Sequence, residues 1–379
     1  MTTETGERPI VPASRSAESA QEAQEAQEAL RLCDQPVGTP LVLPPGLPDA
    51  RVRAIVEGAS KWLNGTVLHY CFFDDGVHGS DVTWTAPQAQ RDVVRRAFET
   101  WKALGIGLVF REVTSLPEAE VRIGFDQGDG SWSYLGRQVL QIPVPERTMN
   151  FGWDLTANPY GLTTALHEIG HTLGMPHEHQ NPFAGIVWDE EAVYASLGGP
   201  PNNWPRATTY HNVLRKISPA AVRGSEWDPD SIMQYAFPAG LIREPVAYAR
   251  GLRPPGDLSP VDREQSGIWY PGEGTVSQPA LLQPFVSVPT SLAPAQQVDY
   301  RVEPTASRTY GIATFGASDT VLGLFENVDG ELRFVAADDD SGHERNASLR
   351  HKLFAGRRYV VRVRCYYAQQ SATTAVMYW

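Results

Sequence analysis

The sequence predicts an α+β domain followed by a small all-β sandwich, and three observations carry this prediction. Over residues 51–272, alternating apolar segments are interspersed with amphipathic helical segments. A stretch rich in Pro, Gly, Ser and Gln follows at 273–285, as expected of an interdomain linker. From 286 to 379 the pattern is that of short strands throughout. We therefore expect a twisted mixed sheet with long helices, then two packed sheets.

Residues 1–50 differ in composition from the rest of the chain. They are rich in Glu, Gln, Ala and Pro, and residues 21–29 repeat the triplet QEA. Few of these side chains can be buried in a core, so we expect a flexible tail or a propeptide. A short helix over the repeat is the alternative, because Ala, Glu and Gln are good helix formers.

The first domain should contain a long helix packed on its sheet. Thr85 and Pro87 mark the start of this helix. Its apolar residues recur at helical spacing and are Val94, Ala97, Phe98, Trp101 and Leu104. The expected strands of the sheet are 65–73, 107–113, 121–125 and 138–142. In the second domain, Asp329-Gly330 predicts a hairpin turn, and residues 359–366 alternate as a half-buried strand.

Net charge and the distribution of apolar residues limit the partners and the cellular locations that we expect for the protein. The 379-residue chain has a formal net charge of -12 and no Lys/Arg-rich run, so nucleic acid is not an expected partner. No apolar run is long enough for a membrane span. Residues 1–15 have neither a basic nor an apolar signal region, which leaves non-classical export or a cytoplasmic location as alternatives. Nothing in the pattern predicts an oligomeric state.

The three cysteines lie far apart in the sequence. Cys33, Cys71 and Cys365 leave at least one thiol unpaired, so the chain is not a disulfide scaffold. Three separate thiols are the expectation. A bridge between Cys33 and Cys71 in an oxidising environment is the alternative.

Residues 165–182 read ALHEIGHTLGMPHEHQNP and contain four of the nine histidines. On a helix, His167 and His171 lie about 40° apart, so both imidazoles can reach one Zn²⁺. Glu168 then lies beside the metal. Gly174 can adopt a left-handed conformation that ends the helix, and the chain can turn to present His177 as the third ligand.

Three imidazoles leave a coordination position for water, and Glu168 can accept a proton from that water. This predicts a zinc-dependent metalloendopeptidase that hydrolyses internal peptide bonds of proteins by Glu-assisted attack of zinc-bound water. The alternative, that these histidines belong to a helix surface or a core, is disfavoured by the full HExxHxxGxxH pattern, since each added position is one that the geometry requires.

With this motif the chain resembles the metzincins, and within them the astacin-like peptidases of bacteria and fungi. The resemblance extends to residues 61–66 (KWLNGT), 130–136 (GSWSYLG), 148–153 (TMNFGW) and 231–235 (SIMQY). It implies a metzincin-type catalytic domain with a zinc cleft between two subdomains. It also implies that Met233 lies in a turn beneath the metal and that Tyr235 is a switchable ligand or oxyanion donor. Gln234 departs from the histidine usual in astacins.

The same resemblance implies further roles near the cleft. Trp132, Ser133 and Tyr134 would form the edge strand that binds an extended substrate by strand addition, with a plain sheet edge as the alternative. The resemblance also implies that Glu178 anchors a mature N-terminus, provided that about fifty residues are removed. His179 is expected behind the ligands or at the surface.

Two expectations concern the ends of the chain. Related peptidases are kept latent by a propeptide cysteine or aspartate at the metal, so Cys33 or Asp34 could act in this way, the alternative being an idle tail. Residues 286–379 resemble the pre-peptidase C-terminal domain of bacterial secreted proteases, through 318–322, 338–342 and 356–363. Asp338, Asp339 and Asp340 could supply ligands to Ca²⁺, or form a solvated acidic turn.

Two other functions compete with the endopeptidase. One is a zinc hydrolase acting on another amide, such as cell-wall peptide. The other is a binding or adhesion protein whose zinc is structural, against which Glu168 argues. The cleavage-site preference depends on loops such as 198–205, and the sequence does not predict their conformation.

Overall fold

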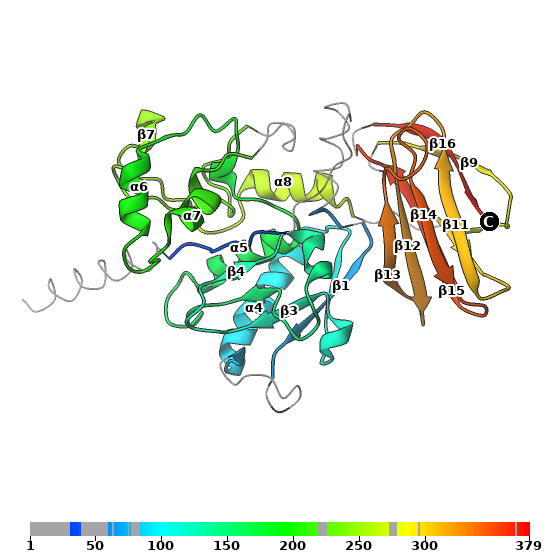
Figure 1. Cartoon of the computed structure of the whole chain (residues 1–379), viewed down its shortest axis with the longest axis horizontal. Coiled ribbons are helices and arrows are strands. Elements are labelled where there is room, and N and C mark those ends of the chain that lie inside the picture. The colour runs from blue at the N-terminus through cyan, green and yellow to red at the C-terminus, as the bar shows by residue number, and fades with distance from the viewer. Residues whose placement is uncertain are drawn as a thin grey trace, which may run out of the picture.

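The computed structural model describes residues 31–38, 60–62, 64–74, 76, 84–217, 226–272, 279–294, 296–367 and 370–379. These residues form a mixed α+β unit and, after it, an all-β unit (Figure 1). The predicted fold class is therefore confirmed. No helix in the described part of the chain is both long and apolar enough to span a bilayer.

The α+β unit is built on a five-stranded sheet, counted over the described residues, with the order β2-β1-β3-β5-β4. Its strands are β1 (Val67–Phe72), β2 (Val109–Glu112), β3 (Val121–Gly124), β4 (Trp132–Ser133) and β5 (Met149–Asn150). Four of them run parallel, and β4 pairs antiparallel with β5 at one edge. An antiparallel edge strand leaves one row of backbone groups available to another chain.

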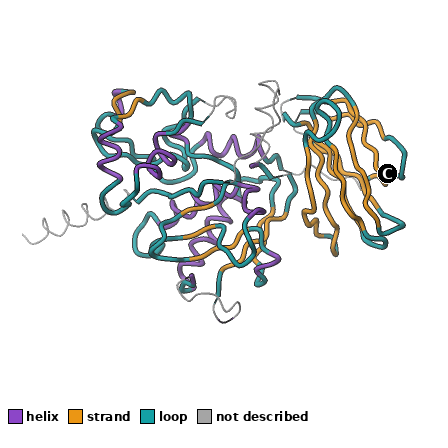
Figure 2. The backbone as a smooth tube through the Cα atoms, in the orientation of Figure 1, coloured by secondary structure: helices purple, strands orange, loops and turns teal. Residues whose placement is uncertain are grey.

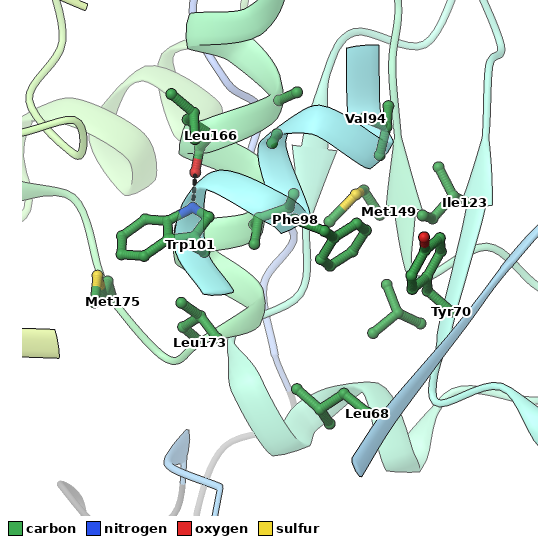
Figure 3. Packing of buried hydrophobic residues seen from close by; sticks show 14 of the residues in the cluster. Leu68, Tyr70, Val94, Phe98, Trp101, Ile123, Met149, Leu166, Leu173 and Met175 are labelled. Carbon is green, nitrogen blue, oxygen red and sulfur yellow. Dashed lines mark hydrogen bonds between the residues drawn. The ribbon is translucent and has the colours of Figure 1, made fainter. Parts of the chain in front are cut away.

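Two helices pack together on this sheet. They are α4 (Gln88–Lys102) and α5 (Gly161–Thr172). The buried face of α4 includes the residues expected from helical spacing, among them Phe98 and Trp101. Figure 3 shows Trp101 against α5, where its indole nitrogen donates to the carbonyl oxygen of Leu166 at 3.1 Å. This contact satisfies a polar atom inside the core and fixes the spacing of the two helices.

The second half of the α+β unit consists mainly of helices and loops (Figure 2). It contains α6 (Glu190–Leu197), α7 (Arg206–Thr209) and a π-helical turn, η5 (Tyr210–Leu214), together with the small ribbon β6 (Val187–Trp188) and β7 (Ile242–Glu244). A separate apolar cluster holds this half together. Helix α8 (Pro260–Trp269) follows and begins with a capping box formed by Ser259 and Asp262.

The all-β unit is a sandwich of two antiparallel-dominated sheets. One has the order β13-β12-β15-β10-β8 and the other β14-β11-β16-β9. The bounds are β8 (Ala280–Leu281), β9 (Val288–Leu292), β10 (Gln297–Val302), β11 (Arg308–Phe315), β12 (Thr320–Val328), β13 (Glu331–Asp338), β14 (Ser348–Leu353), β15 (Arg358–Cys365) and β16 (Ala372–Tyr378). The predicted hairpin joins β12 to β13, with φ 53° at Asp329 and 91° at Gly330.

One predicted strand is wrong. Residues 138–141 belong to a 3₁₀ helix, η3 (Gly136–Gln141), and Ile142 follows its end, because Gly136 adopts φ 49° shortly after β4 and turns the chain. The helix buries Val139 while Leu140 is exposed. A run of apolar residues too short to show a period cannot distinguish these two outcomes.

The N-terminal segment, which we define as residues 31–38, lies between the two halves of the α+β unit (Figure 1, dark blue). Leu32, Cys33 and Gln35 are buried there, which differs from a flexible tail at these three positions, while the propeptide alternative stays a prediction. Apolar and polar residues from both halves of the α+β unit contact this segment and hold it in place. The triplet repeat at 21–29, and the rest of the range 1–50, lie outside the described residues.

Candidate metal centre

Helix α5 carries three of the polar side chains predicted from the sequence. His167, Glu168 and His171 are all buried at its C-terminal half. The helix ends as expected at Gly174, which has φ 90° and donates its amide to the carbonyl of His171 at 2.8 Å. The turn after this glycine brings His177 back to the helix, where its side chain is also buried.

Backbone carbonyls orient two of the imidazoles. Nδ1 of His167 lies 2.7 Å from the carbonyl oxygen of Ile232, and Nδ1 of His171 lies 2.7 Å from that of Met175. A carbonyl oxygen can only accept, so each Nδ1 carries the proton and each Nε2 presents a lone pair. Such outer contacts are typical of metal-binding histidines.

The lone pairs converge. Nε2 of His171 lies 3.0 Å from Nε2 of His177, and the buried Nε2 of His167 has no hydrogen-bond partner among the described residues. Burial lowers the pKa of His167 to about 4 and the pKa values of the other two imidazoles well below 6.5. One nitrogen from each of the three neutral rings can therefore turn a lone pair toward a single cation. The arrangement therefore fits a bound metal ion.

Cys33 supplies a fourth donor. Its sulfur and one ring nitrogen from each of the three histidines lie within 4.8 Å of one another, and no other such cluster occurs in the described part of the chain. Three imidazoles and a thiolate are a tetrahedral donor set that suits zinc and disfavours Ca²⁺ or Mg²⁺. The cofactor that this chain is built to hold is zinc.

Glu168 faces the same centre. Its Oε2 lies 3.4 Å from the sulfur of Cys33. Burial raises the pKa of the Glu168 carboxyl to about 8. The pKa of the Cys33 thiol is also raised, mainly by burial and to a smaller extent by the negative charge of Glu168. Neither group gains from being charged without a cation beside it. A carboxylate at this depth has no packing role, so its presence points to chemistry.

The N-terminal segment is held from both halves of the domain. The amide of Asp34 donates to the carbonyl of Ser131 at 2.9 Å, next to edge strand β4. On the opposite side, the amide nitrogen Nδ2 of Asn212 donates to the Asp34 carboxylate at 2.9 Å. The backbone nitrogen of Leu32 donates to Oδ1 of Asn202 at 3.0 Å. This segment therefore runs between the two halves and is hydrogen-bonded to both.

Met233 lies under the metal-binding helix. Its side chain is buried, and a Cβ atom at Gly170 of α5 would collide with its sulfur, so glycine is needed for this close approach. The carbonyl of Met233 accepts the amide of Glu178 at 3.0 Å, directly after the third histidine. The turn around Met233 thus supports both the helix and the loop that carries His177.

Tyr235 reaches the centre from the same turn. Its hydroxyl donates to the carbonyl oxygen of Cys33 at 2.6 Å and lies 2.7 Å from Nε2 of His177. Burial, with the neighbouring Cys33 and Glu168, raises the pKa of the phenol, which therefore keeps its proton. The hydroxyl is placed where it can approach a metal or a substrate oxygen. Its catalytic role stays a prediction.

The three residues predicted to bind substrate are placed differently from one another. Trp132 packs against the cluster that contains Leu32 and Cys33. Ser133 is buried, and its hydroxyl lies 3.1 Å from that of Thr172, so its side chain faces α5. Tyr134 donates its amide to Thr148 within the sheet. Ser131 is the residue that pairs with the N-terminal segment, one position before the predicted set.

Asp262 was not singled out from the sequence, yet it holds the methionine turn. Its carboxylate accepts hydrogen bonds at 2.7 Å from the hydroxyl of Ser231 and from the amide of Ile232. The Ser-Pro-x-Asp pattern at 259–262 marks a helix N-terminus and was the available signal. That signal says nothing of the turn, because the turn comes from a distant part of the chain.

Glu178, His179 and Gln234 lie behind the ligands. The Glu178 carboxylate accepts from Asn181 at 3.2 Å and from the amide of Asp228 at 3.1 Å, and burial raises its pKa to about 7. His179 is buried with its ring stacked 5.3 Å from that of His177. The side chain of Gln234 donates to the carbonyl of Tyr235 at 2.9 Å. The anchoring role suggested for Glu178 stays a prediction.

Two further expectations concern cysteines and calcium. No disulfide joins Cys33, Cys71 and Cys365, as expected. In the acidic turn, both oxygens of Asp338 accept hydrogen bonds from Ser341, and one also accepts from the amide of Ser348 at 2.7 Å. These hydrogen bonds satisfy both oxygens of the Asp338 carboxylate without a bound ion. Calcium binding by the acidic turn stays a prediction.

Comparisons with known proteins agree with the geometry of the site. No family model matches the chain. Among solved structures, the chain is similar to myroilysin, with 32% sequence identity and a TM-score of 0.50, over 57% of this chain and 98% of that one. It is 32% identical to serralysin of Photorhabdus laumondii over 24% of this chain and 20% of the relative. It is 26% identical to karilysin of Tannerella forsythia over 46% and 42%, respectively.

The fold, the buried histidine cluster and these similarities define a metzincin-type metalloprotease, and the chain belongs to that family. It matches myroilysin over nearly the full length of that protein's solved chain. It spans less than half the length of the curated relatives that it matches.

Proposed function

We propose that the protein is a zinc-dependent endopeptidase of the astacin-like type that hydrolyses internal peptide bonds of proteins. The observation that carries the proposal is the convergence of His167, His171 and His177 beside Glu168. The astacin-like assignment rests on Tyr235, two positions after Met233, whose hydroxyl lies 2.7 Å from Nε2 of His177.

Glu168 is the proton carrier of this proposal. Bound zinc would supply a Lewis acid that polarises the peptide carbonyl and acidifies a water molecule. Glu168 accepts the proton of that water as its oxygen attacks the carbonyl carbon. The carboxyl then gives the proton to the departing amine as the C–N bond breaks. The carboxyl is buried beside the ligands, where bulk water does not compete for the proton between the two transfers.

Tyr235 would stabilise the negative oxygen that forms during attack. Its hydroxyl donates to the carbonyl of Cys33 in this structure, and a peptide carbonyl of a substrate can replace that acceptor. A neutral phenol with a raised pKa remains a donor over the working pH range. The contact with the carbonyl of Cys33 supports this role.

The edge next to β4 would hold the substrate. Ser131 offers its carbonyl to the N-terminal segment through the amide of Asp34. An extended substrate can use the same group once this segment has left, because strand addition relies on backbone atoms. Trp132, packed beside Leu32 and Cys33, would cover the substrate's side chains.

We also propose that the N-terminal segment keeps the enzyme latent through Cys33. Its sulfur takes the place beside Glu168 that a substrate's carbonyl and a water molecule need. A Cys-His₃ set is also a closed, structural type of zinc site. Two features favour latency instead. Glu168 faces the centre, and the segment is joined to the cleft by a few hydrogen bonds around Leu32 and Asp34.

The test is peptide cleavage by protein of defined metal content. Zinc-loaded protein, with latency relieved by Cys33→Ser, is incubated with a peptide library, with a folded protein substrate and with cell-wall peptide. Glu168→Ala in the same background should lower cleavage by about 10²–10⁴-fold while one zinc stays bound, because the general base is lost and the ligands remain.

The matched control is Glu191→Gln, a charge change on an exposed carboxylate of α6 that leaves the site untouched. It should cleave normally. Full activity in Glu168→Ala, or pure folded protein without zinc, would contradict the proposal. Cleavage confined to cell-wall peptide would replace the protein substrate with another amide.

A further inference from the structure

The outer face of one sandwich sheet is unusually apolar. Besides the core between the two sheets, β12, β13 and β15 carry a second cluster that includes Val321, Phe325, Val360 and Phe334. Alternation along β15 places Arg362 on the same outer face, where its side chain is only 3% exposed. The outward face of a sandwich is normally solvated and polar. This face is therefore built to be covered.

The catalytic half of the chain covers it. The guanidinium of Arg362 pairs with both oxygens of Asp299 at 2.7 Å, and its remaining Nη1 donates to the carbonyl of Asn64. Gly65, next in the chain, has φ 81°, and a Cβ atom there would collide with the same guanidinium. Only glycine allows this approach. One arginine thus joins the sandwich to the segment that precedes β1.

Trp62 extends the contact to the metal-binding helix. Its ring meets Phe334 of β13 edge-on, with centroids 6.5 Å apart. Its indole nitrogen donates to the carbonyl of Thr172, the last residue of α5, at 2.7 Å. The side chain is 1% exposed. Phe334 and Thr172 therefore both contact the same indole ring.

Tyr270 completes this arrangement. Its hydroxyl donates to the carbonyl of Leu173 at 2.6 Å and accepts the backbone amide of Trp62 at 3.2 Å. The carbonyls of Thr172 and Leu173 are at the end of α5, where a helix has no partners of its own for such groups. The residues that follow turn through Gly174 to His177. The two aromatic side chains thus fix the start of the turn that carries the third ligand.

We propose that the C-terminal sandwich, through Phe334 and Arg362, is part of the metal centre's support. It holds Trp62, and Trp62 positions the turn from Thr172 to His177. Trp62, Phe334 and Arg362 are positioning residues, because none of them touches the zinc ligands directly. The sandwich is then needed for zinc retention as well as for any binding role of its own.

The experiment uses full-length Trp62→Phe, Phe334→Leu and Arg362→Lys. Trp62→Phe keeps an aromatic ring against Phe334 and loses the hydrogen-bond donor to Thr172. Arg362→Lys keeps the positive charge and loses the paired hydrogen bonds to Asp299. Amide hydrogen exchange of the metal-free protein should show Gly174 and Met175 exchanging about tenfold faster in all three. Zinc release to a chelator should also become about tenfold faster. Neither readout requires peptidase activity, so both remain interpretable if the proposed function fails.

The control is Val376→Ala, which removes buried volume from the other sheet of the sandwich, at β16. It should lower the unfolding temperature and leave both readouts unchanged. The proposal is overturned if the three variants exchange and release zinc at the wild-type rate. It is equally overturned if Val376→Ala accelerates both as much as they do, since loss of overall stability would then be the cause.

Discussion

The sulfur of Cys33 lies 3.4 Å from Oε2 of Glu168, and the carbonyl of the same cysteine accepts the hydroxyl of Tyr235. One residue of the N-terminal segment therefore contacts both groups proposed to perform the chemistry. Its sulfur also lies within the cluster of ligand atoms. In the proposed latent state, Cys33 would take the place of substrate and water and would occupy the hydroxyl of Tyr235 as well.

Replacing Cys33 with serine should raise basal peptidase activity of the full-length protein at least about tenfold, because a hydroxyl is a much weaker zinc ligand than a thiolate. Asp34→Ala keeps the thiol and loses only the hydrogen bond from Asn212, so its activity should rise less. Initial rates on one fluorogenic peptide would measure both. Equal basal activity in the two variants and the wild type would exclude the latch.

Tyr235→Phe should lower kcat by about 10²-fold with little change in KM, because it removes one donor to the developing oxyanion and leaves the cleft intact. The measurement is steady-state kinetics in the Cys33→Ser background. Tyr210→Phe, which alters an exposed phenol, is the control and should behave as its parent. An equal loss in both variants would remove Tyr235 from the mechanism.

Gly174→Ala should destabilise the protein by about 1–2 kcal/mol through its φ of 90° alone. Its Cβ would also lie 3.0 Å from the carbonyl oxygen of Ser60, which adds a steric cost. Gly185→Ala is a matched control, with φ 64° and nothing within 4 Å of the added atom. Urea unfolding of both variants should give the larger loss at Gly174, and the reverse order would contradict the packing argument.

Stability should depend on pH through His69. Hydrogen bonding to Glu120 and Glu331 raises the pKa of this imidazole above 6.5, against the opposing effect of burial. The charged form is therefore favoured in the folded state. Its stabilisation is complete below pH 6.5 and is lost as pH rises through the raised pKa. Urea midpoints from pH 5.5 to 8.5 should fall in the wild type and change less in His69→Gln.

Sequence predictions agree with the structure where the interactions that decide them are local in the sequence. His167 and His171 lie one helical turn apart, and Gly174 follows three residues later, so helical geometry and a C-terminal glycine turn place them. The hairpin at Asp329 was equally local, since two residues with positive φ determine it. Residues 138–142 failed because a short apolar run is compatible with either helix or strand.

Long-range contacts could not be predicted in the same way. The burial of Leu32 and Cys33 depends on partners from both halves of the catalytic domain. Asp262 was recognisable as a helix cap, while its bonds to the methionine turn were not. The pairing of Trp62 with Phe334 likewise joins two domains. Local patterns identify such residues as apolar or polar and carry no information about which distant surface they meet.

The N-terminal segment is part of the same polypeptide as the cleft that it fills. A tethered ligand is present at an effective concentration in the millimolar range, whatever the dilution of the protein. Weak individual bonds are therefore enough to keep the cleft occupied. A single cut between residues 39 and 59 would remove this high effective concentration, because the freed peptide would dissociate and rebind only at its bulk concentration. Activation of the proposed latent form would then be irreversible and would need no change in the affinity of any contact.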